Sequence, residues 1–173
     1  IMEGDYAASK KYPRAPADAE EAADNYDRIL EIIGQVSAEH IAPRAESVDL
    51  EGNTLNADGT VTLAEGTQEN LKALARAQVM GFTLPHRFGG LNCPNLLYTM
   101  STEIVSRADA GLMNIYGLQG IAETVYAFAN DEIKNEVLPR FARGEVTGAM
   151  VLTEPDAGSD LQAVRLRAFQ DDQ

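Results

Sequence analysis

The feature that most constrains this fold is a change in the spacing of apolar residues at Gly144. Before it, apolar residues recur every three or four positions, as in helices that bury one face. After it, "EVTGAMVLT" is β-branched and apolar, and "LQAVRLRAFQ" alternates in the manner of a strand. The sequence therefore predicts a mainly α protein, with a helical domain over residues 24–144 and the first strands of a β domain over 145–173. Because two strands alone leave open edges, we expect this β domain to be truncated here and the natural protein to be longer.

The first two helical stretches have clear candidate ends. Asp24 or Asn25 can cap the first stretch, and Pro43 is expected to end it. Thr67 can cap the second stretch, and Gly81 can supply a left-handed residue after its last turn. Between them, "LNADGTV" combines turn residues with β-formers, which predicts a small hairpin or loop.

Three further helices are predicted before Gly144. Asn95 can cap the third stretch and Asp131 the fifth, which Pro139 is expected to kink or shorten. The fourth stretch, residues 111–130, is nearly uncharged, so we expect a helix buried on all sides. Residues 1–23 contain two prolines and few apolar positions, which is typical of an arm or linker with at most a short helix.

Composition excludes several classes of function. The chain of 173 residues has a formal net charge of −13, which argues against a nucleic-acid or anionic-membrane surface. Its one cysteine, Cys93, excludes an intrachain disulfide, and the two histidines, His40 and His86, are too far apart to suggest a metal site. No apolar run approaches the roughly 20 residues of a membrane span.

The candidate site is "TEPDAGSD", Thr153 to Asp160, which follows the apolar run. Pro155 turns the chain, and Gly158 lets the backbone approach a ligand closely or take a positive φ. Successive N–H groups from Ala157 to Ser159 can form an anion-binding nest. The alternative is a surface turn whose Asp and Ser side chains bond only their own backbone, with Glu154 and Asp160 fixing the loop.

The longer segment "MVLTEPDAGSDL" resembles the signature "A-x-T-E-P-x-A-G-S-D" of the acyl-CoA dehydrogenase flavoenzymes. "MGFTLPHRFGGLN" is similar to an earlier family segment, and "LPRFARGE" stands just before the signature, as in the family. The resemblance runs from about Asn25 to the C-terminus. It implies a helical N-terminal domain followed by a β-barrel-like middle domain. The insert "LEGNTLNADGTVTLAEGT" resembles the larger-chain members of the family.

This resemblance implies FAD as cofactor and assigns five residues to it. Met150, where many members have an aromatic residue, and Leu152 would contact the isoalloxazine. The hydroxyl of Thr153 would bond the flavin near N5. Gly158 and Ser159 would meet the pyrophosphate, and Ser159 would also contact the pantetheine arm of the substrate.

Other residues are interpreted structurally. Met113, Tyr116 and Gly117 could line an acyl pocket, but core packing is the favoured interpretation. His86 is expected to be a loop residue, and Cys93 an unreactive thiol, because nothing basic lies near it in the sequence.

The family reaction is the α,β-dehydrogenation of an acyl-CoA thioester, with electron-transfer flavoprotein as the implied acceptor. The family's catalytic glutamate comes from a C-terminal helical domain, so no base is assigned here and the fragment alone is expected to be inactive. The alternatives are an acyl-CoA oxidase or another flavin enzyme of this fold, or a cofactor-free helical interaction module. The resemblance also implies a homo-oligomer as the full-length protein, and the bacterial cytoplasm or the mitochondrial matrix.

Overall fold

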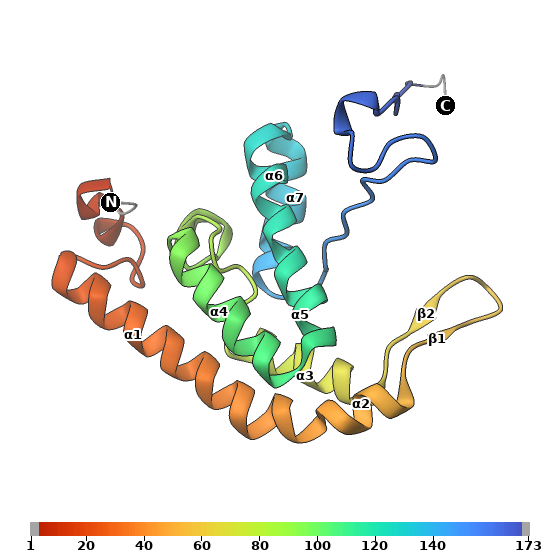
Figure 1. Cartoon of the computed structure of the whole chain (residues 1–173). Coiled ribbons are helices and arrows are strands. Elements are labelled where there is room, and N and C mark those ends of the chain that lie inside the picture. Colours follow the sequence, from red (N-terminus) through yellow and green to blue (C-terminus); the bar gives the residue numbers. More distant parts are fainter. Residues whose placement is uncertain (1–3, 171–173) are drawn as a thin grey trace.

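The computed structural model of the chain describes residues 4–170, which form mainly helices (Figure 1). The α-helices are α1 (Ala19–Val36), α2 (Ala45–Glu51), α3 (Glu65–Arg76), α4 (Asn95–Ala108), α5 (Ala110–Gly117), α6 (Ile121–Phe128) and α7 (Asp131–Ala142). Short 3-10 turns are η1 (Gly4–Lys10), η3 (Ala42–Arg44), η4 (His86–Phe88), η5 (Leu118–Gly120) and η6 (Leu161–Ala163), and η2 (Ser37–Ile41) is a π turn. The predicted helical class is confirmed.

The base of the domain is one long curved helical run through α1 and α2 (Figure 1). It begins at Ala19, where the Asp18 carboxylate accepts hydrogen bonds from the N–H groups of Glu20 and Glu21. The prediction that the helix starts near Asp24 and stops at Pro43 is therefore wrong at both ends. Pro43 lacks an N–H, but the π turn before it and the 3-10 turn around it let the chain continue in the same general direction.

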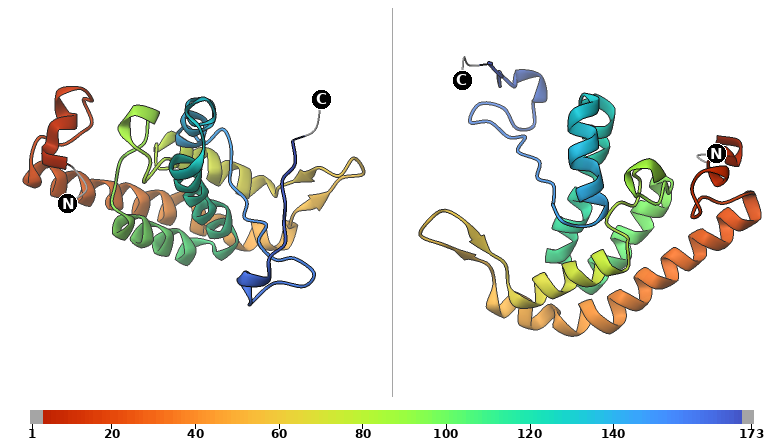
Figure 2. Two further views of the ribbon diagram at one scale, coloured as in Figure 1. Left: turned by 90° about the horizontal axis from the view of Figure 1, so that it is seen from above. Right: turned by 180° about the vertical axis from the view of Figure 1, so that it is seen from behind.

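The predicted hairpin is confirmed in its smallest form. Strands β1 (Thr54–Leu55) and β2 (Val61–Thr62) pair antiparallel, with Thr54 opposite Thr62. Both views in Figure 2 show it extending away from the helices. Its four strand residues are exposed, so hydrogen bonds in the turn hold it together rather than packing against the bundle.

Among the described residues, the core has two parts. The larger part lies between α1, α3, α4 and α5, and the smaller part lies where α6 and α7 pack against the η4 loop. Fully buried residues of the larger part include Ile33, Ile41, Leu74, Val105, Leu112 and Tyr116.

Several predicted helix ends lie elsewhere. α3 starts at Glu65 instead of being capped by Thr67, and α4 has Asn95 as its first residue, with Pro94 before it. The cap of α7 is Asn130, whose side chain accepts from the N–H of Ile133, and not the adjacent Asp131. Both side chains can cap a helix, and the turn that precedes α7 decides which one does. α7 continues through Pro139 to Ala142.

The left-handed residue after α3 is Gln78, with φ 61°, and not Gly81. The N–H of Val79 donates to Leu74 O and that of Gln78 to Ala75 O, which is the Schellman arrangement at a helix end. Gly81 is instead required by packing, because a Cβ there would lie 2.7 Å from the Cα of Ala142.

The uncharged stretch 111–130 is not one helix buried on every side. It divides into α5 and α6 at the 3-10 turn η5, and Phe128 at the end of α6 is 85% exposed. The hydroxyl of Tyr98 joins the two halves, since it donates to Gly117 O and accepts from the N–H of Gly120.

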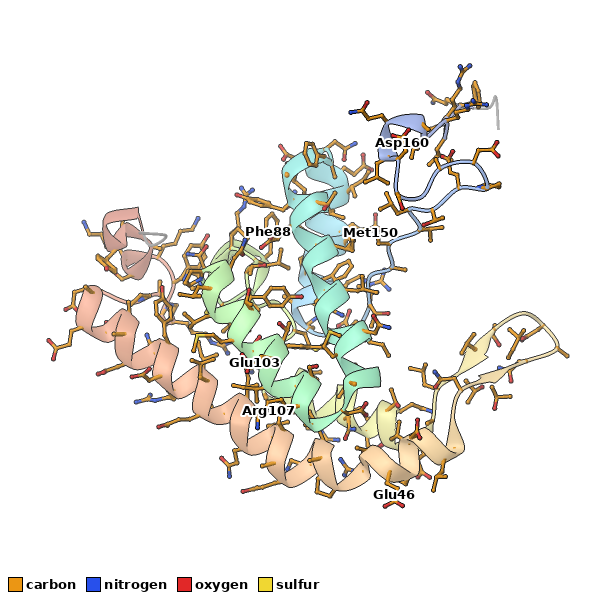
Figure 3. All side chains as sticks on the ribbon, viewed as in Figure 1. Glu46, Phe88, Glu103, Arg107, Met150 and Asp160 are labelled. Carbon is orange, nitrogen blue, oxygen red and sulfur yellow. The ribbon has the colours of Figure 1, made fainter. Side chains whose placement is uncertain are left out.

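The two strands predicted after Gly144 do not form. Residues 145–153 and 164–170 are irregular and mostly exposed, with no ladder partner among residues 4–170 (Figure 3). A strand is stable only when a neighbour pairs with its backbone, and neither predicted strand pairs with the other here. Both segments contain residues that favour strands, but without a pairing neighbour they do not form a sheet.

Candidate cofactor-binding site

The segment that carries the signature leaves α7 through two glycines. Gly144 has φ 71°, and a Cβ there would lie 2.9 Å from Ala75 Cβ. Gly148 passes still closer to the bundle, because its Cβ would lie 2.5 Å from the carbonyl oxygen of Leu118 and 2.9 Å from Ile121 Cβ. Both contacts are closer than side chains tolerate, so the bundle fixes the path of the chain up to position 148.

The signature itself is built on a tight turn. The N–H of Glu154 donates to Ala157 O at 2.8 Å, and the N–H of Ala157 donates to Glu154 O at 3.2 Å. Pro155 occupies the second position of this turn, where its fixed φ is favourable. Ala157 is buried beneath it, so the turn has a small apolar centre of its own.

Two of the three carboxylates fix this loop, as one of the sequence interpretations expects. Glu154 accepts the N–H groups of Arg165 and Leu166 at 2.8 and 2.9 Å, one on each oxygen. Asp160 caps η6 by accepting the N–H of Gln162 at 3.1 Å. These bonds hold the returning chain against the turn, and they engage both oxygens of Glu154.

The five residues assigned to the cofactor lie together on this segment, and most of their surface is open. Met150 is 59% exposed and Leu152 is 47% exposed, while Thr153, Gly158 and Ser159 are all exposed. Figure 3 shows Met150 and Asp160 on the segment that follows α7. Their roles toward a flavin stay predictions.

The turn uses the N–H of Ala157, so the nest predicted over Ala157 to Ser159 keeps only two of its three donors. The N–H groups of Gly158 and Ser159 and the hydroxyls of Thr153 and Ser159 meet no acceptor within residues 4–170. A Cβ at Gly158 would meet only Thr153 Cγ2, at 3.6 Å, which is an ordinary contact. Nothing within residues 4–170 therefore requires glycine at 158, and the backbone there is open to close approach by an outside group. The residues fit the phosphate-binding side of a flavin nucleotide.

The residues considered for an acyl pocket are divided by the structure. Tyr116 is fully buried, and its hydroxyl lies 3.2 Å from Ser101 Oγ, so core packing is its role. Burial raises the pKa of the Tyr116 phenol far above its usual value. Met113 and Gly117 are partly buried on the same helix, α5.

The two remaining candidates, His86 and Cys93, lie outside the signature segment. His86 lies in the η4 loop, and its Nδ1 is 3.1 Å from Gly90 O. Cys93 is 1% exposed and packs in the larger core. Within the described part of the chain, no group of three His, Cys, Asp or Glu side chains could hold a metal ion. No helix there is long and apolar enough to cross a bilayer.

Sequence reasoning missed Gly148 as a positioning residue. Its signal was present, since an isolated glycine in a β-prone run often marks a close backbone approach. Which segment approaches it, the turn between α5 and α6, is visible only in the structure.

Comparisons with known proteins agree on one family. The family model described as "Acyl-CoA dehydrogenase, N-terminal domain" matches residues 24–145. The chain is 32% identical over 154 residues to 3-methylmercaptopropionyl-CoA dehydrogenase of Ruegeria pomeroyi, covering 86% of this chain and 25% of that protein. It is 27% identical over 143 residues to mitochondrial isovaleryl-CoA dehydrogenase of Pongo abelii, covering 82% of this chain and 31% of that protein.

Solved structures share the fold. A glutaryl-CoA dehydrogenase from Mycobacterium smegmatis matches with TM-score 0.68 and 24% identity, over 85% of this chain and 35% of its own. An acyl-CoA dehydrogenase from Bacillus anthracis, solved in complex with FAD, matches with TM-score 0.67 and 24% identity, over 82% of this chain and 22% of its own. The chain thus spans only a quarter to a third of the length of the relatives it matches in sequence. With a family model matched over most of its length, the chain belongs to the acyl-CoA dehydrogenase family and carries that family's N-terminal helical domain.

Proposed function

We propose that this chain is the N-terminal part of an FAD-dependent acyl-CoA dehydrogenase that catalyses α,β-dehydrogenation of an acyl-CoA thioester. The observation that supports this most strongly is the loop after the helical domain. Thr153, Gly158 and Ser159 are exposed and carry donors that meet no acceptor within residues 4–170, while Glu154 and Asp160 are engaged within the loop. The relatives named above all take their names from CoA thioesters.

Each residue has a defined task in this proposal. The N–H groups of Gly158 and Ser159 bind the pyrophosphate, and the Thr153 hydroxyl donates a hydrogen bond to the flavin ring. Met150 and Leu152 provide apolar surface that excludes water from the ring. When bound, FAD supplies the hydride acceptor for the β hydrogen. Ser159 also contacts the pantetheine arm of the substrate.

No residue of this chain is proposed as the catalytic base. Glu154 is the obvious carboxylate near the site, but both of its oxygens accept backbone N–H groups. A carboxylate in that position stabilises the loop and has no free oxygen directed at a substrate. The base is proposed to be a glutamate outside residues 1–173.

The proposal extends to the whole protein. The match of 154 residues covers 25% of the Ruegeria relative, and the match of 143 residues covers 31% of the Pongo relative. The Ruegeria relative is therefore the longer protein. Its higher identity, together with the hairpin insert, supports the larger-chain subfamily. We propose an electron-transfer flavoprotein as acceptor, a homo-oligomer, and the bacterial cytoplasm or mitochondrial matrix as compartment.

The first test is whether the full-length protein contains flavin. We expect it to purify yellow, with FAD that an acyl-CoA substrate bleaches. A colourless protein that cannot be reconstituted with FAD would favour the helical interaction module and overturn the proposal. Rapid reoxidation of the bleached flavin by O₂, rather than by an electron-transfer flavoprotein, would identify an oxidase instead.

A matched pair of variants tests the site itself. Thr153→Ala removes one hydrogen bond to the flavin, so we expect about three- to tenfold weaker FAD binding and a shifted flavin absorbance band. Asp156→Asn changes an exposed turn residue with no hydrogen bond inside the described chain, and should leave both unchanged. Equal flavin content and identical spectra in the two variants would refute the role given to Thr153.

A further inference from the structure

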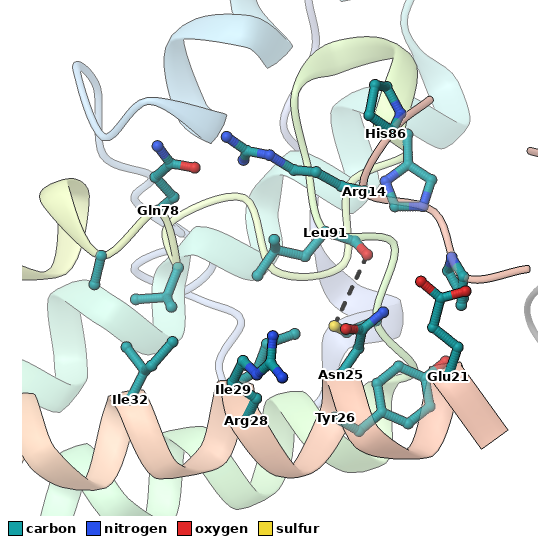
Figure 4. Close-up of a pocket in the computed structure, with 15 residues that line it drawn as sticks. Arg14, Glu21, Asn25, Tyr26, Arg28, Ile29, Ile32, Gln78, His86 and Leu91 are labelled. Carbon is teal, nitrogen blue, oxygen red and sulfur yellow. Dashed lines mark hydrogen bonds between the residues drawn. The ribbon is translucent and has the colours of Figure 1, made fainter. Parts of the chain in front are cut away.

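A pocket of about 440 Å³ lies between the N-terminal arm, α1 and the chain around residues 77–79 and 86–93 (Figure 4). The arm and the start of α1 lie at one end of the chain's fold, and the segment that follows α7 lies toward the other end (Figure 1). Its floor is apolar and comes from several segments: Ile29 and Ile32 of α1, Val79, and Leu91. Ile32 is 37% exposed, so this apolar surface opens to solvent through the pocket.

Two exposed arginines line the same pocket. Arg28 comes from α1 and Arg14 from the arm, and Figure 4 shows the Arg14 side chain reaching across the pocket toward Gln78. Neither forms an ion pair with any residue from 4 to 170, although the chain has 27 acidic and only 14 basic residues. The pocket's own carboxylate, Glu21, accepts the N–H of Ala17 at 2.7 Å and helps to fix the arm.

Gln78, which lines the pocket together with Arg14, has an unusual backbone conformation. Gln78 has φ 61° at the end of α3, a conformation in which a residue with a Cβ is disfavoured and glycine is the ordinary choice. Its side chain lines the same pocket. The strained backbone at Gln78 therefore places an amide side chain, rather than a glycine, in the lining of the pocket.

The wall of the pocket contains a polar atom without a partner. The His86 ring lies against Gly90 O through Nδ1, while its Nε2 is buried and meets no hydrogen-bond partner in the described chain. Buried polar atoms in folded proteins are normally paired, so a bound molecule or a water is expected beside it.

We propose that this pocket binds a small organic carboxylate with a hydrocarbon chain. The guanidinium groups of Arg14 and Arg28 bind the carboxylate, the Gln78 amide adds a donor, and the hydrocarbon lies on Ile29 and Ile32. Guanidinium groups match the fork of a carboxylate, and the apolar floor favours a ligand with a hydrocarbon part over an inorganic ion. This assignment does not depend on the flavin chemistry proposed above.

Calorimetric titration of the purified protein with octanoate tests the proposal. We expect saturable binding with Kd on the order of 0.1–1 mM. Neutral 1-octanol, which lacks the carboxylate, and inorganic phosphate, which lacks the hydrocarbon chain, should each bind at least about tenfold more weakly than octanoate. Comparable binding of either molecule, or no saturation by about 10 mM octanoate, would overturn the proposal.

Variants locate the binding. The double variant Arg14→Gln, Arg28→Gln should raise the octanoate Kd at least about tenfold, since charge-assisted hydrogen bonds are lost. Arg107→Gln makes the same change on α4, outside the pocket, and should leave Kd unchanged. If the double variant binds octanoate as tightly as the Arg107 control, the site is wrongly placed.

A second measurement does not depend on those variants folding. Methyl NMR signals of Ile29 and Ile32 in the unaltered protein should shift on adding octanoate, while those of Ile115 on α5, outside the pocket, should not. Gln78→Gly should weaken octanoate binding while the melting temperature stays equal or rises, because glycine suits its backbone. Unmoved Ile29 and Ile32 signals at saturation would also overturn the proposal.

Discussion

Replacing Gly148 with alanine tests whether the bundle fixes the path of the signature segment. The added Cβ would lie 2.5 Å from Leu118 O and 2.9 Å from Ile121 Cβ. Real Cβ atoms essentially never approach other atoms within 3.0 Å, so a backbone segment must move by at least several tenths of an ångström. The atom in the way is a main-chain oxygen of η5, which cannot rotate aside as a flexible side chain can.

Overpacking of this kind costs about 1–3 kcal/mol. For a protein of this size, we expect Gly148→Ala to lower the melting temperature by about 2–10 °C. The matched control is Gly34→Ala inside α1, where a Cβ would meet nothing within 4 Å. Alanine is a better helix former than glycine, so the control should raise stability by about 0.5–1 kcal/mol.

The assay is thermal unfolding of both variants followed by far-UV circular dichroism, with guanidinium titration to obtain the free energy of unfolding. The same chemical change should thus shift stability in opposite directions at the two glycines. If Gly148→Ala has the same melting temperature as the unaltered protein, the segment can move away from Leu118 without loss of stability. The bundle would then not position Met150 and the residues that follow it.

Two further predictions concern hydrogen-bonded groups. Tyr116→Phe removes a buried hydroxyl 3.2 Å from Ser101 Oγ and should cost about 0.5–1.5 kcal/mol in the free energy of unfolding, measured by guanidinium titration. Burial raises the pKa of Tyr116 in the folded state, so the unaltered protein should lose stability as the pH rises above 10.0, the ordinary pKa of tyrosine. The Phe variant should lose less stability over the same pH range. Equal losses in the two proteins would contradict this role of Tyr116. In the hairpin, hydrogen bonds from the hydroxyl and then the N–H of Thr60 lower the pKa of Asp58 below 3.8. The ionised Asp58 carboxylate stabilises the hairpin turn above pH 3.8, and this stabilisation is lost as the pH falls through the lowered pKa. An NMR titration of the Thr60 amide should therefore have its midpoint below pH 3.8. Asp58→Asn should abolish this transition.

Part of the candidate site could be predicted from sequence. The order Thr153, Gly158, Ser159 within one short loop follows from the chain itself, and so does the possibility that Glu154 and Asp160 fix it. Which N–H groups Glu154 accepts could not be predicted, because Arg165 and Leu166 lie eleven and twelve residues away. The choice between Asn130 and Asp131 as the cap of α7 also depended on the turn before it.

By itself, the sequence determined the helical class, the turn-rich segment that forms the hairpin, and the family signature. Each depends on local spacing, because a helix closes its hydrogen bonds within four residues. The tertiary structure decided which β-prone segments stay unpaired, which backbone Gly148 touches, and that Arg14 and Arg28 line one pocket. Those outcomes require two distant parts of the chain to meet, and the spacing of residues along one segment contains no information about its partner.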